Sequence, residues 1–488
     1  MLAVALFYRA DCPTDWDAWD YTAQAVRGHP SDLLLGRWWF VAVMRSAWLL
    51  ARPVFGLEVH EAFVPMQAVS ALCMAGAVVF GMAWTRRLSH SDSAEVIFAA
   101  LLISGPLMGI YASAVMTESL TVLMLSAAFY TWERALGAGR GRPGWALAAG
   151  LAFGVAVNIR EPALLLAAWP LVSCLVDRPR GAGRLLAVAG AGAAVTFGAG
   201  VLAAWATYPW PEAGYWGNLR QWTQHMAVER RQFPLSLAAN LRHMAVYCTI
   251  ASPLTTLLAA PAAVWAAARR RRVFWLMAAL LGNAGAVLMN HDLLVNPRLV
   301  VPLVWLLAAP VATAVDAALG LQHGRLRLRL GAATMLIVGV SVGATAYHWD
   351  LLLTKHFDHG ESQARMLRVL RELPPHSTVI CGPGTPVARH LNRLGEKRFD
   401  VVASGWDWPR DGSLAERVAR AAEARPVYAN LDRADWRRTE RVGEEWTELH
   451  EVAGQYTLRP VGWPLFELRP PRPASEQDAP PRGKTAWP

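Results

Sequence analysis

The sequence predicts an all-α polytopic membrane bundle of about 10–11 transmembrane helices, followed by a small C-terminal α/β domain on the extracytoplasmic side. The 488 residues are 54% hydrophobic and only 17% charged, whereas soluble chains have about 25% charged residues. Apolar stretches of roughly 18–22 residues recur as far as Tyr347, and each is long enough to cross a bilayer core of about 30 Å. After Asp350 they give way to short alternating strand and helix patterns.

The arginines indicate how the spans are oriented. The candidate spans are 62–85, 95–114, 118–136, 145–159, 161–177, 184–206, 246–267, 273–290, 298–319 and 330–349. The arginine clusters lie at 86–87, 134–142, 178–184, 269–272 and 325–329. Because an even number of spans separates successive clusters, all of them fall on one side, which the bias of Lys and Arg makes cytoplasmic. The formal charge of +10 therefore reflects topology and does not indicate a nucleic-acid partner.

The same count of spans places residues 10–61 on the extracytoplasmic side, because the span 62–85 runs inward to Arg86. Residues 33–57 are apolar but carry Arg37, Arg45 and Arg52, so we expect this stretch to lie on the membrane rather than to cross it. The first eight residues are too short to cross and too short for a signal peptide. We therefore expect a first span that begins upstream of Met1, which in-frame apolar codons before the start would support.

The composition divides the chain into three parts. Residues 1–350 form the transmembrane domain with its outer interfacial loop 10–61, residues 355–469 form the outer α/β domain, and the proline-rich residues 470–488 are expected to be disordered. In the outer domain we expect strands at 378–382, 399–405 and 426–431 and helices at 386–394 and 413–424. Gly382-Pro383-Gly384 predicts a structural turn, because no third glycine follows as in a nucleotide-binding loop.

The cysteines do not predict a metal site. They lack the spacing of zinc ligands and define no disulfide framework, although Cys12 and Cys381 would both lie outside and one bond between them stays open. The residues are Cys12, Cys73, Cys174, Cys248 and Cys381.

An acidic helix is expected near the N-terminus, over residues 14–28. At about 100° per residue, the tryptophans of this helix lie on one face. The opposite face carries Asp17, Asp20, Tyr21, Gln24 and Gly28. This pattern predicts an interfacial helix with an acidic polar face, preceded by Asp15 as its N-cap. Asp17 and Asp20 are either solvated or serve as a general base or a cation site.

Further charged residues fall at the outer ends of the spans. Glu118 either caps the helix that begins at Thr117 or is functional, as intramembrane acids often are. Arg160 interrupts two apolar segments on the side that should be poor in arginine, so it either pairs with a carboxylate such as Glu161 or binds an anion. Arg298 follows His291-Asp292 and stands at a helix start, where backbone N–H groups favour a phosphate.

Several short motifs occur in a fixed order. They are Asp17-x-x-x-Tyr21-x-x-x-Ala25-x-x-Gly28, Thr117-Glu118, the glycine-rich stretch from Gly150 to Arg160-Glu161-Pro162, and Pro297-Arg298-Leu299 through Pro302. Over about residues 12–310 the chain resembles the GT-C glycosyltransferases, the group that holds protein mannosyltransferases and the aminoarabinose transferase of lipid A. Glu118 stands where the family usually has aspartate and Leu299 where it usually has tyrosine, so the subfamily and substrate stay open.

The resemblance implies a reaction. The donor would be a sugar on a polyprenyl phosphate, with its headgroup facing outward, and the acceptor a hydroxyl of a lipid, glycan or protein that attacks the anomeric carbon with inversion. Asp17 would be the general base, and Asp20 or Glu118 would orient the acceptor or tune Asp17. Arg298 and Arg160 would bind the donor phosphate. Such enzymes generally need no metal, so we expect no cofactor, although adjacent acids could bind a divalent ion.

Aromatic residues and His291 add possible contacts to sugar or lipid. Tyr21, Trp216 and Trp222 are candidates, but tryptophans in the outer loop 207–245 are equally typical of an interfacial belt. Arginine in place of lysine, with much alanine, indicates a GC-rich bacterial genome. The expected location is the bacterial inner membrane, multi-pass, with active site and C-terminal domain on the periplasmic or extracellular side.

Two other functions remain in competition. A multi-span transporter or flippase of lipid-linked sugars would place its polar groups near the bilayer midplane, often in two related halves. Here the polar groups gather at one surface and no internal repeat is visible, which favours the enzyme. A non-catalytic membrane scaffold that presents its outer domain is the third possibility.

Overall fold

The computed structural model describes two compact units. The described residues are 1–30 except Asp15, 37–137 except Ser104, 142–210, 236–290, 297–319, 358–382, 387–395, 399–403, 413–431 and 440–470 except Pro464, with single helical residues within 214–224 and 335–347. The transmembrane unit comprises Met1–Ala10 and Gln24–His356, and the C-terminal unit comprises Asp11–Ala23 and Phe357–Pro488. Residues 11–23, expected in the outer loop of the membrane domain, are thus grouped with the C-terminal residues.

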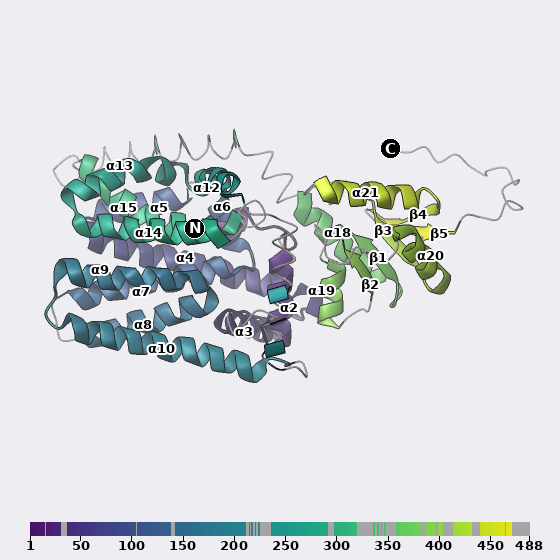
Figure 1. Ribbon diagram of the computed structural model, residues 1–488, viewed down its shortest axis with the longest axis horizontal. Helices are drawn as coiled ribbons and strands as arrows, with labels where there is room; N and C mark the ends of the chain where they lie inside the picture. Colours follow the sequence, from purple (N-terminus) through teal and green to yellow (C-terminus); the bar gives the residue numbers. More distant parts are fainter. Residues whose placement is uncertain are drawn as a thin grey trace, which may run out of the picture. The chain divides into compact units, whose positions relative to one another are not determined.

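The transmembrane unit is a bundle of helices (Figure 1). Its elements are α1 (Leu2–Phe7), the last four residues of α2 (Trp16–Arg27), α3 (Trp38–Phe55), η1 (Val59–Glu61), α4 (Phe63–Ser89), α5 (Asp92–Ile103), α6 (Pro106–Ser113), α7 (Thr117–Leu136), α8 (Arg142–Ile159), η2 (Glu161–Ala167), α9 (Ala168–Asp177), α10 (Ala182–Thr207), α12 (Leu237–Ala251), α13 (Pro253–Arg269), α14 (Arg271–Asn290), η3 (Pro297–Val300) and α15 (Val301–Leu319). These bounds confirm the all-α membrane bundle, and the last predicted span, 330–349, lies outside the continuously described residues.

Two predicted spans are bent pairs of helices. Among the described helices, four are long and apolar enough to cross a membrane, or up to six if the pairs α5–α6 and α12–α13 each count as one span. Pro106 and Pro253 begin the second helix of each pair, because proline suits a first helical turn but disfavours helix in the residue before it. The breaks contact each other: a Cβ on Gly105 would lie 1.8 Å from the Ala251 carbonyl oxygen, and Ser252 Oγ donates to the Leu101 carbonyl at 2.8 Å.

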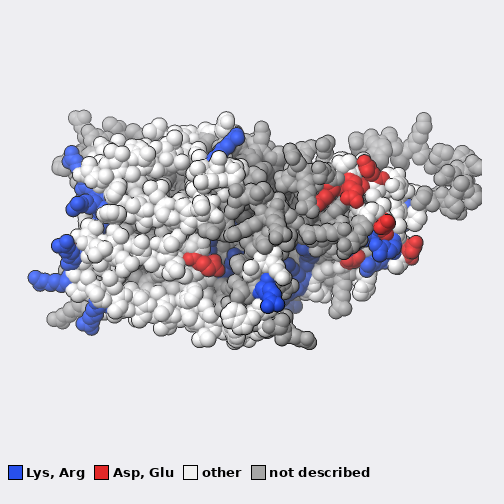
Figure 2. All heavy atoms as spheres, in the orientation of Figure 1, with Lys and Arg blue, Asp and Glu red and all other residues white. Residues whose placement is uncertain are grey.

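Arginines from three of the predicted clusters lie at one end of the bundle, whereas the cluster at 325–329 is outside the described residues. The guanidinium carbons of Arg87 in α4 and Arg134 in α7 lie 5.9 and 6.0 Å from the Tyr130 ring, and Arg272 in α14 pairs with Asp177 in α9 at 3.0 Å. Figure 2 shows basic side chains at the left end of this unit and a mostly uncharged lateral surface. The helix ends that carry arginine therefore share one side, as the even number of crossings predicts.

Residues 33–57 contain α3, a helix with two apolar faces. Phe40 and Met44 are fully buried in the protein, whereas Leu50 and Phe55 are each 73% exposed. An apolar face left uncovered beside a membrane bundle suits contact with the bilayer interface. The interfacial position of α3 stays a prediction.

The C-terminal unit contains a five-stranded sheet with strand order β2-β1-β3-β5-β4. The first three strands are parallel and β5 is antiparallel to both its neighbours. The elements are α18 (Asp358–Glu372), β1 (Thr378–Cys381), α19 (Val387–Leu394), β2 (Asp400–Ala403), α20 (Leu414–Ala424), β3 (Val427–Asn430), α21 (Glu440–Ala453), β4 (Thr457–Gly462) and β5 (Leu465–Arg469).

The three predicted strands and two predicted helices of this unit are confirmed. The β4–β5 hairpin was missed because Pro460, Gly462 and Pro464 interrupt the alternation that predicts a strand. The predicted glycine turn continues into residues 383–386 and the predicted disordered tail covers 470–488, and both lie largely outside the described residues. None of the five cysteines, all of them described, forms a disulfide.

Candidate functional site

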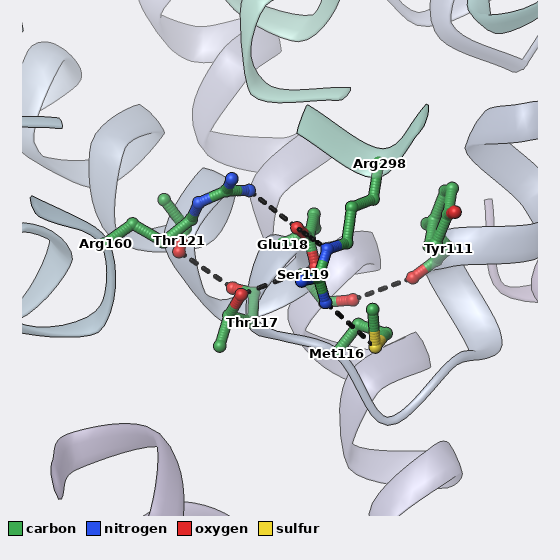
Figure 3. A network of polar contacts seen from close by, with 8 residues as sticks. All are labelled: Tyr111, Met116, Thr117, Glu118, Ser119, Thr121, Arg160 and Arg298. Carbon is green, nitrogen blue, oxygen red and sulfur yellow. Dashed lines mark hydrogen bonds and ion pairs between the residues drawn. The ribbon is translucent and has the colours of Figure 1, made fainter. Parts of the chain in front are cut away.

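Glu118 lies buried at the first turn of α7. Its side chain has no exposed surface, and Met116, the N-cap of α7, makes no side-chain capping bond. The exposed N–H groups of a helix start stabilise a negative charge there, and Thr117 Oγ1 donates to Glu118 Oε2 at 3.4 Å. Neighbouring hydroxyls bond to backbone, with Ser119 Oγ donating to the Tyr111 carbonyl at 3.0 Å. The carboxylate therefore stands in a fixed polar turn (Figure 3).

Two arginines from distant parts of the sequence converge on this carboxylate. Arg160 Nη1 donates to Glu118 Oε1 at 2.6 Å, and Arg298 Nε lies 3.9 Å from the same oxygen. The arginine side chains are only 13% and 10% exposed, and Figure 3 shows them reaching Glu118 from opposite sides. Arg160 thus pairs with Glu118, while Glu161, the partner suggested by the sequence, is exposed.

A break between α8 and η2 positions Arg160. The residue is extended, with φ −143° and ψ 109°, and Pro162 stands in the first turn of η2. The carbonyl of Pro162 accepts a hydrogen bond from Asn283 Nδ2 of α14 at 2.8 Å. On the other side of the break, the Asn158 carbonyl accepts the Arg37 backbone N–H at 2.6 Å. Asn283 was not recognised from the sequence, where a lone asparagine in an apolar helix gives only a weak signal.

The register of α7 against α15 brings Arg298 to Glu118. Arg298 belongs to η3, directly before α15, and its Nη1 lies 3.7 Å from the Met116 sulfur. About two turns further along each helix, Trp305 Nε1 donates to Ser126 Oγ at 2.9 Å. Both helices therefore start at this site and are held in register by a buried hydrogen bond.

The site and the arginine clusters lie at opposite ends of α7. Glu118 is in its first turn, and Arg134 is in its last turn. At 1.5 Å per residue, the separation along the axis is about 24 Å. The carboxylate and its two arginines therefore occupy the end of the bundle opposite to Arg134, the end that the sequence predicts to be extracytoplasmic.

Asp17 and Asp20 belong to the C-terminal unit. They lie on α2, which confirms the predicted helix; Asp17 is half-buried and Asp20 pairs with Arg393 of α19. The Trp19 ring packs 4.6 Å from the His390 ring, and Tyr21 is only 1% exposed. Packing thus covers residues on both faces of α2, so Asp20 and Tyr21 are not simply solvated. The interfacial position of α2 stays a prediction.

Gly28 in the N-terminal motif has a packing role in the transmembrane unit. It follows α2 with a φ of +86°, the left-handed region that glycine adopts at helix ends. Arg45 Nη1 donates to the Val26 carbonyl at 2.6 Å and to the Ala25 carbonyl at 3.3 Å. A Cβ on Gly28 would lie 2.5 Å from that same nitrogen. Arg45 thus caps the end of α2, a role that the sequence alone did not reveal.

Trp216 is 75% exposed, and His291 and Trp222 lie outside the described residues, as does the expected N-cap Asp15. In the described part of the chain, no three His, Cys, Asp or Glu residues are grouped so as to hold a metal ion.

Comparisons with known proteins agree with this architecture. A family profile described as dolichyl-phosphate-mannose-protein mannosyltransferase matches residues 45–205. The structure of ArnT from Cupriavidus metallidurans bound to undecaprenyl phosphate has a TM-score of 0.59 and 14% identity, covering 96% of this chain and 95% of that chain. The oligosaccharyltransferase of Archaeoglobus fulgidus, in complex with Zn and sulfate, has a TM-score of 0.56 and 13% identity, covering 96% and 72%.

The chain has the GT-C glycosyltransferase fold. Together with the family match, this confirms the predicted enzyme class, a glycosyltransferase integral to the membrane. Comparison with curated protein sequences found no match.

The matched residues 45–205 include Glu118 and Arg160 but end before Arg298. Arg298 lies outside the matched region, and only the tertiary structure shows that it approaches Glu118.

Proposed function

We propose that this protein transfers a sugar from a polyprenyl-phosphate donor to an acceptor hydroxyl on the extracytoplasmic face of a bacterial inner membrane. The observation that carries the proposal is the buried cluster in which Arg160 and Arg298 meet Glu118. Guanidinium groups in a largely water-excluded site bind phosphate through charge-assisted hydrogen bonds. Glu118 holds both groups in place before the donor arrives, so little reorganisation is needed.

The comparisons support this donor class. ArnT was solved with undecaprenyl phosphate, and the Archaeoglobus fulgidus oligosaccharyltransferase AglB with an inhibitory peptide and a dolichol-phosphate. Both ligands place a phosphate on a long apolar chain, which a site at the end of a membrane bundle can accept. The acceptor is a hydroxyl of a lipid, glycan or protein.

The proposed reaction is a single displacement with inversion. Asp17 removes the proton from the acceptor hydroxyl while its oxygen attacks the anomeric carbon, and the bond to the phosphate oxygen breaks. The polyprenyl phosphate leaves with the bonding electron pair, and Arg298 and Arg160 stabilise its developing charge. General-base assistance of this kind is typically worth about 10²–10⁴ in rate.

We further propose that the reaction needs no metal cofactor. Glu118 already forms an ion pair with Arg160, and two nearby guanidinium groups would repel a divalent metal ion. Although the Archaeoglobus fulgidus enzyme was solved with Zn, the arginines supply the charge stabilisation here. Asp20 remains an auxiliary residue, and its ion pair suggests that it acts on α2 rather than on the acceptor.

Replacing Asp17 tests the proposal. Asp17→Asn keeps the size of the side chain but removes the base, so transfer should fall by about 10²–10⁴. The measurement is release of polyprenyl phosphate from a labelled donor by the full-length protein in detergent or vesicles, after mass spectrometry of co-purified lipid has identified the sugar.

Asp92→Asn is the matched control, because Asp92 is an exposed carboxylate at the arginine end. Unchanged transfer by Asp17→Asn would remove Asp17 from its role. Sugar that crosses vesicles without any release of polyprenyl phosphate would instead support a transporter or flippase.

A further inference from the structure

The first half of α2 is docked on α19 of the C-terminal unit. The Trp19 ring packs against the His390 ring with centroids 4.6 Å apart, and His390 Nδ1 lies 3.1 Å from the Trp19 carbonyl oxygen, which can only accept a hydrogen bond. Asp20 forms an ion pair with Arg393, one turn further along α19. A ring contact, a hydrogen bond from a side chain to a backbone carbonyl, and an ion pair thus join these helices within four residues of Asp17.

The helix that receives α2 is itself firmly placed. Asn392 Nδ2 donates to the Phe399 carbonyl at 2.8 Å, and the Phe399 backbone N–H donates to Asn392 Oδ1 at 2.7 Å. These paired bonds tie the end of α19 to the residue before β2. Val387 and Leu391 on the same helix are fully buried. Arg393 and His390 therefore project from a helix whose position in the C-terminal unit is fixed.

The ion pair bears directly on the orientation of Asp17. Asp17 and Asp20 are three residues apart, so they project from neighbouring positions on one side of α2. Holding Asp20 fixes the rotation of the helix about its axis, and holding the Trp19 carbonyl fixes its position along the axis.

We propose that Arg393 and His390 are positioning residues for the glycosyltransferase reaction. Through Asp20 and Trp19 they hold α2 so that Asp17 meets the acceptor hydroxyl, and the C-terminal unit is thereby part of the catalytic apparatus. The inference rests on the proposed function, since it takes Asp17 as the general base. Misplacement of a reacting group by about 1 Å can cost about 100-fold in rate.

The test compares two arginines of the C-terminal unit. Arg393 and Arg425 each pair with an aspartate, and their side chains are 36% and 39% exposed, but Arg425 contacts Asp400 rather than α2. In the full-length protein, Arg393→Gln should lower kcat roughly 10–100-fold while the KM for donor and the binding of undecaprenyl phosphate stay unchanged. Arg425→Gln should leave kcat unchanged.

Charge exchange separates positioning from a general loss of stability. Combining Asp20→Arg with Arg393→Asp restores an ion pair and should recover most of kcat, whereas each single variant is impaired, and Arg393→Lys should keep most of the activity. Thermal unfolding of every variant is measured in parallel. Recovery in the exchanged pair supports positioning even where the single variants fold poorly.

Equal kcat values for Arg393→Gln and Arg425→Gln would overturn the inference, and so would an exchanged pair that folds but stays inactive. Asp17→Asn distinguishes this outcome from failure of the proposed function. If Asp17→Asn abolishes transfer while Arg393→Gln does not affect it, only the positioning inference fails. If Asp17→Asn is fully active, the general-base proposal itself fails.

Discussion

At the scale of residues, the buried cluster around Glu118 shows how a membrane protein keeps charge in an apolar region. A buried arginine without a partner is costly, and a carboxylate nearby reduces this cost. Glu118 reaches Arg160 at 2.6 Å while remaining 3.9 Å from Arg298. The carboxylate therefore organises the two cations that we propose bind phosphate.

This arrangement predicts the effect of removing the charge of Glu118. Glu118→Gln leaves two arginines without their carboxylate, so the protein should lose about 3–5 kcal/mol of stability and the KM for donor should change. Glu118→Asp keeps the charge and should retain most of the activity. Thermal unfolding and donor titration check both variants, and a fully stable, fully active Glu118→Gln would show that the pairing has no such function.

At the scale of elements, α2 is restrained at both of its ends. Its start contacts α19 through Trp19 and Asp20, and its last carbonyls accept hydrogen bonds from Arg45. Capping of helix carbonyls by an arginine is favourable because it meets groups that have no partner within the helix. An arginine of α3 thus holds the end of the helix that carries Asp17.

Gly28 supplies the corresponding prediction. Gly28→Ala forces an alanine into a left-handed conformation, which costs about 1–2 kcal/mol, and also pushes its Cβ against Arg45. We expect kcat to fall roughly 10-fold because α2 shifts. Gly56→Ala is a matched control, since Gly56 has a φ of +64° but no atom within 4 Å of a built Cβ. Equal kcat values for the two variants would contradict a role for the Arg45 cap.

At the scale of the whole molecule, the transmembrane unit has two chemically different ends. Arg87, Arg134 and Arg272 mark one end, and Glu118 with its two arginines marks the other. The lateral surface between them is mostly uncharged in Figure 2. This separation is the expected outcome when lysine and arginine bias orients the spans while a few buried charges are kept for function.

Reporter fusions test this polarity. Alkaline phosphatase joined after residue 470 should be active, because that segment is expected outside the cytoplasm. Green fluorescent protein joined at the same place should not fluoresce. The reverse is expected for fusions after residue 180, between α9 and α10 at the arginine end. The opposite pattern would place the arginine clusters outside and overturn the assignment of the site to the extracytoplasmic face.

Sequence alone determined the class of the molecule and most of its helices, because long apolar stretches and clustered arginines are local properties of the chain. It also identified Glu118, Arg160 and Arg298 as charges in unexpected places. Only the tertiary structure decided that these three meet, since helix register and the break before Pro162 depend on contacts such as that between Trp305 and Ser126.

The same limit applies to α2. Periodicity predicted the helix and its two faces, but it could not predict that Asp20 pairs with Arg393, 373 residues away, because the partners of a polar face are chosen by packing rather than by local pattern. Composition therefore fixed what kind of protein this is, and long-range packing decided which of its charges act together.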